Sequence, residues 1–291
     1  MRPSLPLLLV AALLGGCGDG LFYQPSHTEY GTPQQVGQKY EEVYFTSRDG
    51  TRLHGWFIPA QGRPKATIVH FHGNAQNISA HYAFVAWLPR QGYNVFTFDY
   101  RGYGKSEGKP GRSGIHEDAQ AALDYIAARQ DTGTPNLVVF GQSLGGAIGI
   151  VAAAERTQGI RAVIIDSTFT AYRDIARDKA HEVPLVGSVA GSAPSLLASN
   201  AYNPIDYIAR IAPIPLLLMH GTDDAVIPIA HSQRLFEQAG APKQLWVQNG
   251  GRHIEAFSGF LPQMGPIVLR FLDQSLSGAA VPTGQGAVER N

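Results

Sequence analysis

The sequence predicts an α/β domain with a mostly parallel, eight-stranded sheet and helices on both of its faces. Short apolar runs of strand length alternate along the chain with segments whose apolar residues recur at helical spacing. The strand-like runs are 42–46, 53–58, 67–71, 94–98, 137–140, 162–165, 215–219 and 244–247. Such an alternation of strand and helix is typical of a parallel sheet that is covered on both faces.

The first two strand-like runs are predicted to form an antiparallel hairpin. Asp49 and Gly50 lie between them, and an Asp-Gly pair is a strong hairpin-turn signal. The later runs are short, continuous and apolar, as expected for strands that are buried on both faces. Helices are predicted where apolar residues follow helical spacing, within 79–90, 119–126, 144–156, 230–239 and 264–275.

Length and composition fit one large globular domain with additional residues at its ends. The chain has 291 residues, 44% of them hydrophobic, and its 23 basic and 23 acidic residues give a net charge of zero. This balance argues against a nucleic-acid partner, because such proteins neutralise phosphates with an excess of Lys and Arg. The single cysteine, Cys17, excludes both an intramolecular disulfide and a cysteine-rich zinc site.

The amino terminus has the layout of a secretory signal. One arginine precedes an apolar run at 5–14, and Leu-Gly-Gly-Cys at 14–17 resembles the cleavage box of bacterial lipoproteins. That resemblance implies a signal peptide at 1–16, lipidation of Cys17 with chains such as palmitate, and a place in the bacterial cell envelope. The protein would be anchored on the periplasmic or outer-membrane side. The alternative is an ordinary secretory signal that ends in a chance cysteine.

The domain itself is predicted to span 40–276, after a Gly-rich and polar tether at 17–39. Residues 167–213 contain Pro184, Pro194 and Pro204 and break the alternation of strands and helices. We interpret them as a small, helical, lid-like insertion at the carboxyl edge of the sheet. Its apolar residues are candidates for an acyl pocket or for ordinary packing: Leu185, Val186, Leu196 and Leu197. Residues 277–291 lack periodicity and are predicted to be a flexible tail.

The clearest chemical signal is Gly-Gln-Ser-Leu-Gly at 141–145, between a predicted strand and a helix of small residues. In that context Gly-x-Ser-x-Gly is a nucleophile elbow, whose glycines permit a turn tight enough to project Ser143. A serine hydroxyl needs a base, and the base needs an acid to orient it. Candidates for both follow later strands, in His-Gly-Thr-Asp-Asp at 220–224 and Asn-Gly-Gly-Arg-His at 249–253.

Together with His-Phe-His-Gly-Asn-Ala at 70–75 and Asp-Tyr-Arg-Gly-Tyr-Gly-Lys-Ser at 99–106, these motifs resemble those of α/β-hydrolases, in the order typical of that family. The similarity is to a group with serine esterases, lysophospholipases and acyl-protein thioesterase-like enzymes. It implies Ser143 as nucleophile, Asp224 as acid and His253 as base, with the backbone N–H groups of Asn74 and Leu144 as the oxyanion hole. The side chain of Asn74 is expected to stabilise its loop.

Other residues compete for these roles. Asp223 adjoins the predicted acid, and Asp166 ends a predicted strand from which some members of the family take their acid. Among the other histidines, His72 and His220 are expected to hydrogen-bond their own loops, and His231 is expected to be solvated on a helix face. The choice between these carboxylates depends on geometry that a sequence does not contain.

The sequence thus predicts a lipid-anchored serine hydrolase that cleaves carboxylic esters or thioesters of a small molecule or a lipid. Neither a cofactor nor a metal is predicted. Gly-Lys-Ser at 104–106 lacks the first glycine of a phosphate-binding loop, and the histidines at 70 and 72 have no further ligand at metal-binding spacing. A peptidase or amidase, an acyltransferase and a non-catalytic binding module of the envelope are the alternatives.

Overall fold

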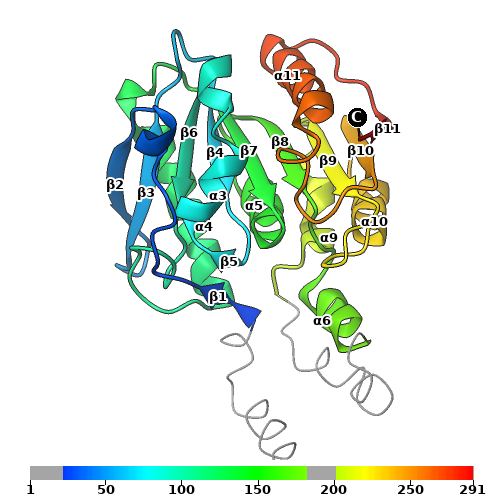
Figure 1. Cartoon of the computed structure of the whole chain (residues 1–291), viewed down its shortest axis with the longest axis horizontal. Helices are drawn as coiled ribbons and strands as arrows, with labels where there is room; N and C mark the ends of the chain where they lie inside the picture. Colours follow the sequence, from blue (N-terminus) through cyan, green and yellow to red (C-terminus); the bar gives the residue numbers. More distant parts are fainter. Residues whose placement is uncertain (1–21, 182–200, 291) are drawn as a thin grey trace, which may run out of the picture.

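The computed structural model describes residues 22–181 and 201–290, which contain a nine-stranded sheet (Figure 1). The strands are β2 (Glu41–Thr46), β3 (Arg52–Ile58), β4 (Ala66–Phe71), β6 (Tyr93–Phe98), β7 (Leu137–Gln142), β8 (Ile160–Asp166), β9 (Leu216–Gly221), β10 (Lys243–Asn249) and β11 (Gly284–Glu289). Their order across the sheet is β11-β10-β9-β8-β7-β4-β6-β3-β2. The predicted hairpin is confirmed, since β2 and β3 are antiparallel. β3 is also antiparallel to β6, and every other pairing in this sheet is parallel.

Helices cover both faces of this sheet, as predicted. One face carries α4 (Arg112–Ala128), α5 (Leu144–Glu155), η5 (Ile208–Ile211) and α10 (Ala230–Gln238). The other carries α3 (Ile78–His81), the 3₁₀ turns η2 (Tyr82–Phe84) and η3 (Leu88–Gln91), and α11 (Leu261–Ser277). The helix predicted within 79–90 is therefore broken into short pieces. Pro89, which has no amide hydrogen to donate, lies in the last of them.

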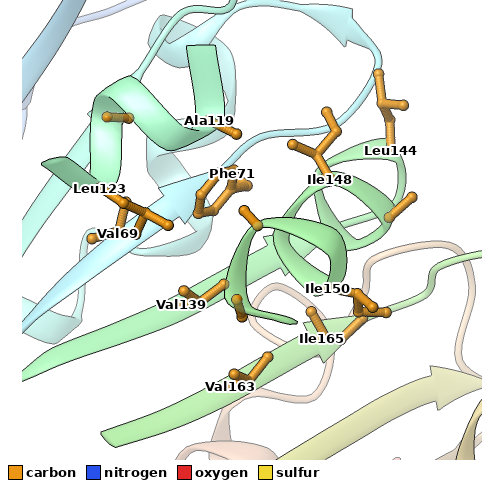
Figure 2. Packing of buried hydrophobic residues seen from close by; sticks show 14 of the residues in the cluster. Val69, Phe71, Ala119, Leu123, Val139, Leu144, Ile148, Ile150, Val163 and Ile165 are labelled. Carbon is orange, nitrogen blue, oxygen red and sulfur yellow. The ribbon is translucent and has the colours of Figure 1, made fainter. Parts of the chain in front are cut away.

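The central strands are apolar throughout because both of their faces are buried. Figure 2 shows Val69, Val139 and Val163 on neighbouring strands beneath α4 and α5, and all three are completely buried. The adjacent residues Ile68 and Val138 belong to the second apolar cluster, on the opposite face. The sheet is therefore rigid, and it fixes the positions at which the loops at the carboxyl ends of its strands begin.

The predicted flexible tail at 277–291 is wrong for residues 284–289. Its residues Gly284–Glu289 form β11, the ninth strand, which pairs with β10 from Gln244↔Gly284 to Asn249↔Glu289. The glycines at 284 and 286 hide the strand in the sequence, since glycine weakens any strand pattern. The edge of β10 nevertheless offers unpaired backbone groups, and the tail satisfies them.

The predicted tether at 17–39 is also wrong for its described part. β1 (Gln24–Pro25) pairs with β5 (Ala75–Gln76), and a 3₁₀ helix, η1, spans Pro33–Val36. Tyr23 is only 4% exposed, so its burial holds the segment on the domain. Cys17 and the predicted signal peptide lie outside the described residues.

The insertion at 167–213 contains helices at both of its ends, α6 (Tyr172–His181) and α9 (Pro204–Tyr207). The four apolar residues proposed for an acyl pocket lie between them, outside the described residues. In the part of the chain that the structure describes, no helix is long and apolar enough to cross a membrane.

Candidate active site

Ser143 lies in a sharp turn between β7 and α5, with φ 53° and ψ −120°. A non-glycine residue adopts a positive φ only at a cost of about 1–3 kcal/mol, and such strain is typical of functional sites. The flanking glycines make the turn sterically feasible. A Cβ on Gly141 would collide with the carbonyl oxygen of Gly145, and one on Gly145 with the carbonyl oxygens of Phe71 and His72. The predicted nucleophile elbow is present.

Hydrogen bonds to neighbouring segments hold the backbone of Ser143. Its N–H donates to the carbonyl oxygen of Asp166 at 2.9 Å, and its own carbonyl oxygen accepts from Thr168 Oγ1 at 2.7 Å. Leu144 begins α5, where a backbone N–H has no acceptor within the helix. The amide at this position, directly after Ser143, suits a developing negative charge.

The predicted acid and base are in contact. Asp224 Oδ2 accepts a hydrogen bond from His253 Nδ1 at 2.7 Å, and Oδ1 accepts from the amides of Val226 at 2.8 Å and Ile227 at 2.9 Å. Burial raises the pKa of Asp224, but hydrogen bonds from His220 and His253 outweigh it and hold that pKa well below its usual range. Asp224 therefore stays ionised behind the imidazole.

Neither rival carboxylate contacts His253. Asp166 is completely buried and accepts hydrogen bonds from Gln142 Nε2 at 3.1 Å and Ser167 Oγ at 3.2 Å. Burial raises its pKa to about 6. Asp223 is exposed, and its carboxylate accepts from the hydroxyl of the preceding threonine. The geometry therefore favours Asp224 as the partner of the histidine.

The loops that carry Ser143 and His253 are attached to two adjacent residues, Asp166 and Ser167. Ser143 N–H donates to the carbonyl oxygen of Asp166, and the amide of Ile254 donates to Ser167 Oγ at 3.3 Å. Among the described residues, no hydrogen bond joins Ser143 Oγ to His253. Catalytic hydrogen bonds of this kind often form fully only when substrate is bound.

The loop after β4 brings Asn74 to the same end of the sheet, and the Asn74 side chain stabilises this loop. Its Nδ2 donates to the carbonyl oxygen of Phe22 at 2.6 Å, while Oδ1 accepts from Gln24 N–H at 3.1 Å and from Tyr103 Oη at 2.9 Å. With the side chain committed in this way, the backbone N–H is the group left for the predicted oxyanion hole.

Comparison with known proteins identifies the family of the chain. A family model described as serine aminopeptidase, S33, matches residues 62–210. The chain belongs to this family of α/β-hydrolases. YfhR of Escherichia coli K12 is 45% identical over 243 residues, which cover 81% of this chain and 80% of YfhR. The α/β-hydrolase domain-containing protein WAV2 of Arabidopsis thaliana is 36% identical over 235 residues, or 78% of this chain and 76% of WAV2.

A solved structure shows the same fold. The esterase Pf2001 of Pyrococcus furiosus superposes with a TM-score of 0.71 and 24% sequence identity, over 88% of this chain and 98% of that one. The predicted fold class is confirmed, with one more strand in the sheet than the sequence indicates.

Other histidines of the hydrolase have structural roles. His72 is completely buried and its Nδ1 lies 2.7 Å from the carbonyl oxygen of Gly73, as predicted. The solvated His231 is a wrong prediction, because only 3% of it is exposed. Its ring lies 2.9 Å from Thr170 Oγ1 and 2.8 Å from Asp178 Oδ2, so it joins α10 to α6. The described residues contain no group of three His, Cys, Asp or Glu side chains arranged to hold a metal ion.

Glu255, two residues after His253, belongs to the site and is not predicted by the sequence. Glu255 accepts hydrogen bonds from the backbone N–H of Arg252 at 2.8 Å, from the Arg252 guanidinium at 2.9 Å, and from Arg290 at 2.5 Å. Burial raises the pKa of Glu255, but the bonds to Arg252 and Arg290 outweigh this and lower it to about 2. The loop of His253 is thereby tied to the residue that follows β11. Nothing in the sequence indicates this contact, because it depends on the position of β11.

Proposed function

We propose that this hydrolase cleaves carboxylic esters or thioesters of a small acyl substrate through an acyl-enzyme on Ser143. The observation that carries the proposal is the 2.7 Å contact between His253 and a fully buried Asp224 side chain, at the end of the sheet where the strained serine projects. A buried, ionised carboxylate on Nδ1 leaves Nε2 of the ring as the atom able to take up the proton of a serine.

The reaction then has two halves. His253 accepts the proton of Ser143 while Oγ attacks the acyl carbon, and the backbone N–H groups of Leu144 and Asn74 stabilise the oxyanion. His253 returns the proton to the leaving alcohol or thiol as the C–O or C–S bond breaks. Water, deprotonated by the same imidazole, releases the acid and restores Ser143. Asp224 keeps the ring oriented and stabilises the imidazolium throughout.

Amide hydrolysis is the second candidate, because the matched family is described as a serine aminopeptidase. The same residues can attack an amide, but an amine is a poorer leaving group than an alcohol and depends more strongly on protonation by the histidine. Rates on matched p-nitrophenyl esters and p-nitroanilides separate the two. A higher kcat/KM on the anilide would favour amidase activity over the proposed esterase activity. Product analysis with added alcohols would reveal acyl transfer.

The nucleophile is tested with Ser143→Ala and with Ser258→Ala, an exposed serine near the histidine loop, as the matched control. We expect Ser143→Ala to abolish p-nitrophenyl ester hydrolysis and labelling by a fluorophosphonate, with an unchanged circular dichroism spectrum. Ser258→Ala should keep both activities. Labelling that persists in Ser143→Ala would refute the assignment, and a wild-type chain that neither hydrolyses nor labels would favour a non-catalytic binding module.

We also propose that Cys17 carries a lipid that anchors the protein in the bacterial cell envelope. The support is the sequence Leu-Gly-Gly-Cys after an apolar run. Cys17→Ser should move the protein from the membrane fraction to the soluble fraction or block its processing. Unchanged recovery with the membrane would contradict the anchor.

A further inference from the structure

The described chain begins beside the proposed oxyanion loop. Phe22, the first described residue, accepts a hydrogen bond through its carbonyl oxygen from Asn74 Nδ2 at 2.6 Å. Gln24 donates to the same side chain, and β1 continues the contact by pairing with β5, directly after Asn74. The amino-terminal segment thus enters the domain at the edge of the candidate active site.

The ring of Phe22 also contacts the start of the insertion. Its centroid lies 5.4 Å from that of Tyr172, in α6, and 6.3 Å from that of Phe169. The neighbouring Thr168 donates its hydroxyl to the carbonyl oxygen of Ser143. Figure 1 shows β1, β5 and α6 at one end of the sheet. The amino-terminal segment, the oxyanion loop and the insertion therefore all border the nucleophile.

The length of chain before Phe22 limits where an anchor can lie. Cys17 precedes Phe22 by five residues, which span at most about 18 Å in any conformation. A domain of about 250 residues has a radius of gyration of about 18 Å and hence a diameter of roughly 45 Å. A segment of this length cannot pass around the domain. A lipid on Cys17 therefore holds the active-site end of the sheet closest to the bilayer.

We propose that the carboxyl end of the sheet faces the membrane and that the substrate is the acyl ester of a lipid in that membrane. This inference rests on the proposed hydrolase function and on the lipid at Cys17. Val226 lies in the loop at this end of the sheet, two residues after Asp224, and is 44% exposed. An apolar side chain beside the catalytic loop favours contact with acyl chains over contact with water.

The first test measures orientation without activity. Because Cys17 is the only native cysteine and is lipidated, a second cysteine can be labelled alone with an environment-sensitive dye. Val226→Cys places the dye on the active-site end, and Gln130→Cys, an exposed site ahead of β7, places it at the other end. In phosphatidylcholine vesicles with brominated acyl chains, we expect quenching at position 226 to be at least twice that at position 130. Equal quenching would overturn the orientation.

The second test lengthens the segment. A 30-residue Gly/Ser insert between Gly18 and Asp19 adds a flexible span of about 30 Å and frees the domain to turn. We expect its rate on a fluorogenic acyl-ester lipid in the same vesicles to fall at least fivefold, with an unchanged rate on a water-soluble p-nitrophenyl ester. The control has the same insert between Gln61 and Gly62, in an exposed loop at the opposite end of the sheet, and should keep both rates.

The outcomes separate the two proposals. If the lengthened chain hydrolyses the vesicle lipid as fast as the wild type, the membrane-facing site is wrong while esterase activity stands. If no form of the protein hydrolyses the soluble ester but position 226 is quenched, the orientation stands and the proposed function fails. A chain recovered without lipid, free of the vesicles, overturns the orientation.

Discussion

Asp224 Oδ2 lies 2.7 Å from His253 Nδ1, whereas Asp166, the other buried carboxylate near this histidine, is hydrogen-bonded by an amide and a hydroxyl. We expect Asp224→Asn to lower kcat by roughly 10³- to 10⁴-fold, because a neutral amide no longer stabilises the correct tautomer of the ring. Asp166→Asn should keep kcat within about tenfold. Steady-state kinetics on one p-nitrophenyl ester measures both. A greater loss in Asp166→Asn would reassign the acid.

Asp166 should make the stability of the protein depend on pH. Burial raises its pKa from 3.8 to about 6. Between these values the folded chain holds a proton on Asp166 that the unfolded chain releases, so the contribution of Asp166 to the free energy of unfolding falls as the pH rises from about 4 to about 6. The shift corresponds to roughly 3 kcal/mol. In urea denaturation from pH 4 to 7, the free energy of unfolding of the wild type, taken relative to that of Asp166→Asn, should fall by about that amount.

Asp224 acts with the opposite sign and in a different window. Its pKa is depressed by the hydrogen bonds of His220 and His253 against the effect of burial, so its stabilising contribution is complete above pH 4 and is lost as the pH falls below that. Five buried histidines whose pKa is lowered by burial make the stability rise with pH in the same range: His70, His72, His81, His116 and His231. The contribution of Asp166 is therefore isolated by the difference between the wild type and Asp166→Asn. Parallel curves for the wild type and Asp166→Asn over this range would contradict the raised pKa.

Asn74 should affect the rate more than the stability. Asn74→Ala removes the bonds to Phe22, Gln24 and Tyr103 and frees the loop of the proposed oxyanion donor, so we expect kcat to fall by about 10- to 100-fold. Tyr103→Phe removes one of these bonds and should have a smaller effect. Asn77→Ala is the control, because its amide donates to the same amino-terminal segment, at Ser26 and Thr28. If it lowers kcat equally, the effect belongs to the segment as a whole.

Arg290 should support the histidine loop from a distance. Arg290→Met removes the 2.5 Å bond to Glu255, and we expect kcat to fall several-fold as the loop of His253 loosens. The arginine side chain is 45% exposed, so the free energy of unfolding should change by at most about 1 kcal/mol. Arg270→Met, an equivalent change at an exposed position of α11, is the control. Equal kcat values for the two variants would rule out the support.

The parts of the site that the sequence predicts are those that are local in the chain. The elbow around Ser143 requires glycines two residues to either side, and this requirement is visible as a motif. His220 lies near the end of β9 and Asp224 in the loop that follows it, and the spacing of the two residues identifies them. The parallel strands are visible because burial on both faces demands continuous apolar residues. The choice of Asp224 over Asp166 is not local in the chain, because it depends on which carboxylate reaches the ring of His253 in the folded protein.

The parts that the sequence misses derive their conformation from a partner elsewhere in the chain. β11 is a strand because the edge of β10 is open, although its glycines disfavour a strand. Residues 22–24 lie against the domain because Asn74 bonds their backbone and the side chain of Tyr23 is buried. His231 is buried because α6 covers it. None of these contacts produces a periodic pattern in its own segment. The sequence of each segment alone therefore predicts a flexible or solvated segment.

Both ends of the described chain contact loops of the candidate active site: Phe22 contacts the loop of Asn74, and Arg290 contacts the loop of His253. The nine strands between them have an apolar core of their own. Limited proteolysis at either terminus should therefore lower the rate of catalysis while leaving a folded remnant. The rate of catalysis would then show whether both ends of the polypeptide are intact. Spectroscopic measurements of folding would not detect the loss of either end.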